Sequence, residues 1–204
     1  MHFWRKNFFE TLKEIEAEAL SRPEWADYAI FCREYEKGLR PQALKSLERF
    51  ISTIERGPFE DRRSFVSWLL GRVDGRAGRH MLVPQPLHIR VIEPTLLEWT
   101  LIEPKCSEPH RWLGGYEHLK HAVELEPNDE TARRKLLAII LGKVGMSTHE
   151  LPQGYLGSVQ DDLAALREAE ELLTGLLDHE VRDRFAADIA EERERIQKYL
   201  PGSR

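Results

Sequence analysis

Cysteine is scarce in this 204-residue chain, which contains only Cys32 and Cys106. The two lie far apart and in no spacing typical of a metal site, so a disulfide scaffold is not expected. Neither neighbourhood shows a Cys–His motif of the kind that activates a nucleophilic thiolate. The scarcity favours a reducing compartment, and we expect a cytoplasmic protein.

Long apolar runs and an excess of positive charge are also missing. No segment approaches the roughly 18 apolar residues of a membrane span, and the N-terminus lacks the apolar run of a signal peptide. We therefore expect no membrane association. The 35 acidic residues outnumber the 30 basic ones, and the net charge of −5 disfavours general binding to nucleic acid.

The two common nucleotide-binding loops are absent, because neither Gly-x-x-x-x-Gly-Lys-Ser/Thr nor Gly-x-Gly-x-x-Gly occurs in the sequence. The glycine-rich connector at residues 71–80 instead carries Arg72, Arg76, Arg79 and His80. Guanidinium groups on a flexible backbone suit phosphate or the carboxylates of a partner. A solvated loop is the alternative interpretation.

Helical periodicity is present in nearly every long segment. Apolar Ala43, Leu47 and Phe50, for example, recur at steps of four and three, which places them on one face of a helix. A Thr-x-x-Glu capping box at Thr95 indicates the start of another helix. The sequence therefore predicts an all-α protein made of antiparallel helix hairpins or an irregular helical bundle.

Residues 81–94 differ from the rest, because they contain three prolines. Between these prolines Leu87, Ile89 and Val91 alternate with polar residues, which predicts a short extended segment near residues 87–92. This segment divides the chain into an N-terminal helical half at 1–80, a proline-rich connector and a C-terminal helical half at 95–204. A single packed domain is the alternative.

Residues 112–138 are typical of one helix, a Pro-Asn-Asp turn and the start of a second helix. Small, large, small and helix-ending residues follow in order at Gly115, Leu119, Ala122 and Pro127. This stretch resembles the second helix and exit turn of a tetratricopeptide repeat, whose small residues let two helices approach closely. Residues 24–57 resemble the same repeat more loosely. The resemblance implies helix hairpins with a concave groove that holds an extended peptide.

The resemblance places aromatic Trp25, Tyr28 and Tyr35 on the concave surface of the first hairpin. Tyr and Trp suit peptide binding because each offers rigid apolar area and a polar tip. The alternative is that the same aromatic stripe packs against the N-terminal helix.

The remaining binding candidates are polar. By the same resemblance, Thr131 and Arg134 face the groove from the helix that follows Pro127. We expect Arg76 and Arg79 of the connector to contact an acidic partner at the rim.

Histidines on the helix 110–126 offer an alternative chemistry. His118 and His121 are three residues apart, and Glu117 is adjacent, so one helix face presents ligands for a metal ion. No further ligands are visible by spacing, and hydrogen-bonded or exposed helix residues are the competing interpretation.

We predict a protein–protein interaction scaffold or adaptor that binds a peptide or partner protein through a helical groove and needs no cofactor. The alternative is a metal-dependent enzyme built on the His/Glu site. A third possibility is a regulatory module that contacts nucleic acid through the arginine connector. Two apolar stripes in the C-terminal helices also permit a homodimer.

Overall fold

The computed structural model describes residues 3–76 and 78–200, and within them it is all-helical, without a strand. Its contacts divide the chain into two compact units, Met1–Pro104 (unit 1) and Lys105–Arg204 (unit 2). The all-α prediction is confirmed. Among the described residues, no helix combines the length and the apolar character needed to cross a membrane.

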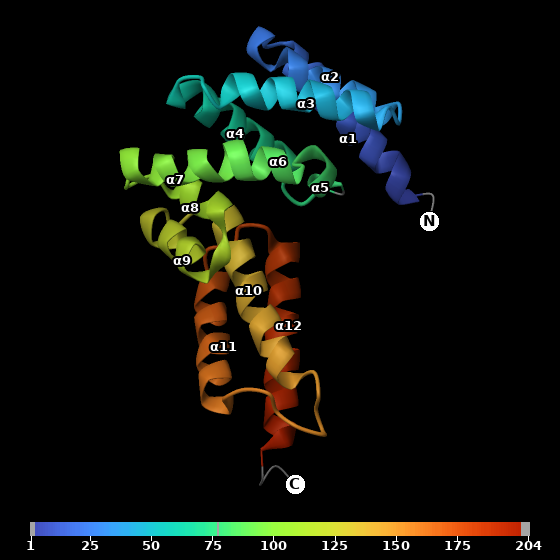
Figure 1. Ribbon diagram of the computed structural model, residues 1–204. Helices are drawn as coiled ribbons and strands as arrows, with labels where there is room; N and C mark the ends of the chain where they lie inside the picture. The colour runs from blue at the N-terminus through green and yellow to red at the C-terminus, as the bar shows by residue number, and fades with distance from the viewer. Residues whose placement is uncertain (1–2, 77, 201–204) are drawn as a thin grey trace. The chain divides into compact units, whose positions relative to one another are not determined.

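Unit 1 begins with helices that pack side by side as α1 against α2 and α2 against α3 (Figure 1). Pro23 lies at the start of the 3₁₀ turn η1, where a missing N–H costs nothing. Gly38, with φ of 76°, makes the left-handed bend between α2 and α3. The bounds in this part are α1 (Phe3–Leu20), η1 (Pro23–Trp25), α2 (Ala26–Glu36), α3 (Arg40–Ile54) and α4 (Phe59–Val73).

The second part of unit 1 is a short turn of helix followed by a continuous helical run that ends in α7 (Figure 1). Pro84 precedes this run and Pro86 lies within its first turn, a position that tolerates proline. The bounds are α5 (Arg79–Leu82), α6 (Gln85–Leu87), the π-helix η2 (His88–Ile92) and α7 (Glu93–Ile102).

The predicted extended segment at residues 87–92 is wrong, because these residues are helical. Pro94 cannot donate a hydrogen bond and its ring would crowd the carbonyl one α-turn earlier, so the wider π turn before it relieves that conflict. Within the π turn Val91 and Ile92 are buried and Ile89 is 53% exposed, and Leu87 just before it is also buried. The alternation of apolar and polar residues that predicted a strand therefore belongs to a helical segment with one buried face.

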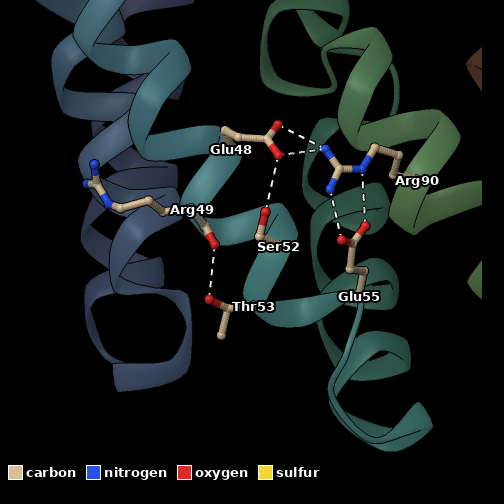
Figure 2. Close-up of polar contacts among 6 residues, drawn as sticks. All are labelled: Glu48, Arg49, Ser52, Thr53, Glu55 and Arg90. Carbon is tan, nitrogen blue, oxygen red and sulfur yellow. Dashed lines mark hydrogen bonds and ion pairs between the residues drawn. The ribbon is translucent and has the colours of Figure 1, made fainter.

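Arg90 ties η2 to α3 (Figure 2). Its Nη1 donates to Oε1 of Glu48 at 2.8 Å, and its Nη2 donates to Oε1 of Glu55 at 2.8 Å. Ser52 donates a further hydrogen bond to Glu48 at 3.1 Å. The hydrogen bond from Arg90 lowers the pKa of the Glu48 carboxyl. Two carboxylates satisfy this guanidinium, so we assign the cluster to structure rather than to ligand binding.

The core of unit 1 is rich in aromatic rings. Tyr28 lies edge-on to Phe65 with ring centroids 5.0 Å apart, and the rings of Phe50 and Phe65 are 4.5 Å apart. The Tyr28 hydroxyl donates a buried hydrogen bond of 2.6 Å to the Leu82 carbonyl. This bond attaches the α5 segment to the centre of unit 1.

Unit 2 is a helical bundle in which α10 packs against α9, α11 and α12 (Figure 1). Gly114, with φ of 72°, separates α8 from α9, and Gly115, the first residue of α9, has a φ of 74°. The helix, turn and second helix predicted after residue 112 are present, with the first helix beginning at Gly115. The bounds are α8 (Ser107–Leu113), α9 (Gly115–Leu125), α10 (Glu130–Thr148), α11 (Val159–Leu173) and α12 (His179–Tyr199).

Asp129 fixes the turn between α9 and α10. Its Oδ1 accepts the N-capping hydrogen bond of α10 from the amide of Ala132 at 2.9 Å. Its Oδ2 accepts a hydrogen bond from Arg111 of α8 at 3.0 Å. Asp129 is almost fully buried, and both of its carboxylate oxygens accept hydrogen bonds, as a buried polar group requires. Its contacts connect α8 and the end of α9 to the start of α10.

Candidate functional site

A surface pocket of about 470 Å³ lies where α9, α10 and α11 meet in unit 2. Four aliphatic residues and four polar residues line it. The aliphatic residues are Ile139, Ile140, Ala164 and Ala165, and the polar residues are Tyr116, Lys143, Asp161 and Glu168. The small side chains of α11 leave open the space beside the two isoleucines of α10. Its size and mixed lining are typical of a binding site.

A second pocket, of about 430 Å³, adjoins the first and shares Lys143 and Asp161 with it. Its other lining residues include Met146 and Leu156, which are 65% and 62% exposed. We call the two pockets together the α10–α11 groove. Large apolar side chains exposed beside a hollow surface are typical of interaction sites.

Tyr116 and Glu168 form one wall of the groove. The Tyr116 hydroxyl lies 2.8 and 2.7 Å from the two carboxylate oxygens of Glu168, to which it donates. This hydrogen bond, with some burial, raises the pKa of Tyr116. Lys120 adds an ion pair to Glu168 at 3.8 Å. The wall is therefore held by contacts made within unit 2.

The side chains of Lys143 and Asp161 differ from those of Tyr116 and Glu168 in having no polar partner in the described part of the chain. Among the residues that the structure describes, neither side chain has a hydrogen bond or ion pair. They stand on α10 and α11 at the place where the two pockets join. One cation and one anion thus remain available to a ligand in the middle of the groove.

The far end of the groove is fixed by the loop before α11. The Leu156 amide donates to the Ser147 carbonyl at 3.0 Å. The Tyr155 hydroxyl donates to the buried Asp162 carboxylate at 2.7 Å, and the pKa of Tyr155 is raised by burial and by this bond. At Gly157 an added Cβ would lie 2.6 Å from the Ser147 Oγ, so the loop approaches α10 too closely for a side chain.

Two of the predicted groove residues are instead core residues of unit 1. Trp25 is 1% exposed and Tyr28 is fully buried, so neither offers surface to a partner. The physical reason is that both rings pack on Phe65, with centroids 5.5 and 5.0 Å from it. Tyr35 is half-buried and lines a different pocket of unit 1.

Thr131 and Arg134 lie on α10 but do not line the α10–α11 groove. Arg134 precedes Lys143 by about two and a half helical turns, so the two side chains leave opposite sides of the helix. The neighbouring Arg133 faces α11 instead, where it donates to the Leu172 carbonyl at 3.0 Å.

The two connector arginines have different surroundings. Arg76 donates to the Glu14 carboxylate of α1 at 2.6 Å, so its charge is already paired. Arg79 is exposed at the start of α5. The structure therefore leaves Arg79 as the rim candidate with an uncommitted side chain among the described residues.

Three histidines gather between α8 and α9. The Nδ1 atoms of His110 and His118 are 3.1 Å apart, and the ring of His121 stands perpendicular to that of His110 with centroids 4.6 Å apart. Burial and the two neighbouring rings lower the pKa of His110. Glu117 is exposed, and His121 turns toward Glu124, with 3.4 Å between Nδ1 and Oε2.

The structure does not bring the predicted ligands His118, His121 and Glu117 together as a metal site. Across residues 3–76 and 78–200, no group of three or more His, Cys, Asp or Glu residues is arranged to hold a metal ion. Cys32 is fully buried, and burial raises the pKa of its thiol, which fits a packing role.

Sequence reasoning missed the α10–α11 groove. The available signal was the run of apolar residues Leu136, Leu137, Ile139, Ile140 and Leu141, which is wider than one buried helix face requires.

Comparison with protein-family models, with curated proteins and with solved structures finds no match for this chain.

Proposed function

We propose that this protein works by protein–protein interaction and that unit 2 binds a partner segment in the α10–α11 groove. The observation that carries the proposal is the pair Lys143 and Asp161, which the two adjoining pockets share and which have no polar partner among the described residues. Apolar side chains of the segment pack on Ile139, Met146 and Leu156, where exposed apolar area is available.

The opposite charges give the segment a direction. An acidic side chain of the partner pairs with Lys143, and a basic one pairs with Asp161, so the reversed segment places like charges together. The apolar contacts supply most of the affinity, because partly exposed ion pairs contribute little. The partner chemistry is therefore an amphipathic segment with one residue of each charge between its apolar anchors.

We infer that α9 and α10 form a degenerate tetratricopeptide-like hairpin, on the residues Gly115, Leu119, Ala122 and Pro127. The burial of Leu119 and Ala122 supports close helix packing in this hairpin. The groove lies along the hairpin's second helix and α11.

Display of a random peptide library against the intact protein tests this function. We expect enrichment of amphipathic peptides that an Ile139→Asp variant no longer retains. Leu177→Asp is the matched control, because Leu177 is in unit 2, is 78% exposed and lies outside the groove. Enriched peptides that bind Ile139→Asp as well as wild type, or an absence of enrichment, contradict the proposal.

A charge exchange refines the test. Replacing Lys143→Glu together with Asp161→Lys keeps the net charge and reverses the pair. Peptides selected on this variant are expected to carry their acidic and basic residues in the opposite order. Unchanged order would show that the pair does not orient the segment.

A further inference from the structure

A separate pocket lies in unit 1, between α2, α3 and the segment that includes α5. Its volume is about 280 Å³. Four apolar residues and three residues with polar ends line it. They are Phe31, Leu44, Met81 and Pro84, and Tyr35, Arg40 and His80. The proposed interaction in unit 2 does not involve this pocket.

The pocket has an uneven charge. Arg40 and His80 are basic, and none of the lining residues is acidic, although the whole chain has a net charge of −5. Among the described residues, neither the Arg40 guanidinium nor the Tyr35 hydroxyl has a hydrogen-bond partner or ion pair. Several other arginines of unit 1 pair with carboxylates, as Arg33 does with Glu16 and Arg49 with Asp27.

The rim of the pocket is held in place from inside the unit. Leu82 is fully buried, and its carbonyl accepts the 2.6 Å hydrogen bond from the buried Tyr28 hydroxyl. Phe31, on the floor, is also fully buried and packs on Tyr35 with ring centroids 5.7 Å apart. Met81 and Tyr35 are therefore positioned by core contacts, which lowers the ordering cost of binding.

We propose that this pocket binds a small amphipathic carboxylate. The apolar body of the ligand lies against Leu44, Met81 and Pro84, which expose surface in the pocket, and its carboxylate receives hydrogen bonds from Arg40. A planar guanidinium matches a carboxylate with two parallel hydrogen bonds. The volume is near the lower limit for small-molecule sites, which suits a free small acid better than an extended chain.

Titration with octanoate, followed by amide chemical shifts in the intact protein, tests the assignment. Octanamide is the matched probe, because it keeps the apolar chain and lacks the charge. We expect octanoate to shift the amides of Tyr35 and Met81 and to bind more tightly than octanamide. Arg40→Gln should weaken octanoate binding by about two- to fivefold, because Arg40 is exposed and an exposed ion pair contributes little, and it should leave octanamide binding unchanged.

Arg56→Gln is the control variant, since Arg56 is an exposed arginine of unit 1 outside the pocket. It should bind octanoate like wild type. Leu44→Glu places an anion at an exposed position of the lining and should abolish octanoate binding without disturbing the core. Equal losses in Arg40→Gln and Arg56→Gln, or shifts confined to other residues, would overturn the proposal. Tighter binding of an N-acetyl leucyl-aspartate dipeptide than of octanoate would also overturn the assignment to a free small acid.

Discussion

The two units fill their interiors with different side chains. Unit 1 buries aromatic rings, among them Trp25, Tyr28 and Phe65, in a connected cluster. The core of unit 2 is mostly aliphatic, and Phe185 is the single aromatic residue among its described buried residues. The comparison teaches that the rings fill the interior of unit 1 and leave only a small surface pocket, whereas the small residues of α11 leave a larger hollow beside α10 in unit 2.

The surfaces differ in the same way. In unit 1 the pocket is small, and its lining carries positive charge only. In unit 2 the groove is larger, and its Lys143 and Asp161 side chains have no polar partner among the described residues. We therefore infer different ligands for the two units, a small acid and an amphipathic segment.

The largest predicted effect comes from removing a ring from the aromatic core of unit 1. Phe65→Ala removes a ring that touches Trp25, Tyr28 and Phe50, and it should lower the stability of unit 1 by about 3–5 kcal/mol. Chemical denaturation followed by tryptophan fluorescence measures this loss, since Trp25 and Trp68 adjoin the site. Leu44→Ala is the exposed control, and a cost below about 1 kcal/mol for Phe65→Ala would contradict the assigned core.

The sequence predicted the helices well where local signals decide them. Pro127 and Asp129 mark the turn before α10, and both act locally through the backbone. The π turn at residues 88–92 could not be predicted, because the alternation of Leu87, Ile89 and Val91 also fits a strand. Only packing decides which of these side chains is buried.

The candidate sites depend even more on tertiary contacts. An aromatic stripe at helical spacing marks one helix face but does not say whether another element covers it. Phe50 and Phe65, from α3 and α4, cover Tyr28. Lys143 and Asp161 line the same groove from two different helices, and no spacing within either helix reveals that they lie near each other.

The next effect concerns the loop that shapes the end of the groove in unit 2. Gly157→Ala should destabilise unit 2 by about 1–3 kcal/mol, because the new Cβ would lie 2.6 Å from the Ser147 Oγ and 3.2 Å from the Asp162 Oδ2. Gly154→Ala is the matched control, since nothing lies within 4 Å of a Cβ there. Thermal unfolding of both variants measures the difference. Equal melting temperatures would show that this loop does not press against α10.

A smaller effect follows from the histidines of unit 2. The pKa of His110 in the folded protein is below its ordinary value of 6.5, so the unfolded chain binds more protons as the pH falls through that value. The stabilising contribution is therefore present above about pH 6.5 and is lost below it. Urea unfolding at about pH 7.5 and about pH 5.5 measures this loss. His110→Gln should reduce the difference between the two conditions, and an unchanged difference would contradict the assignment to His110.

The smallest stability effect sharpens the contrast between closed and hollow packing. Ala164 is exposed on the lining of the α10–α11 groove, so Ala164→Leu has room for the larger side chain and should change stability by less than about 0.5 kcal/mol. Ala43, in the core of unit 1, is fully buried, so Ala43→Leu should cost about 1–3 kcal/mol by overpacking. Denaturation of both variants measures the two changes in stability.

Ala164→Leu should also reduce binding of the selected peptides, because the leucine occupies the space that they fill. A variant that keeps both its stability and its peptide binding would show that the peptides bind elsewhere on unit 2, and a large stability loss would show that the groove is closed.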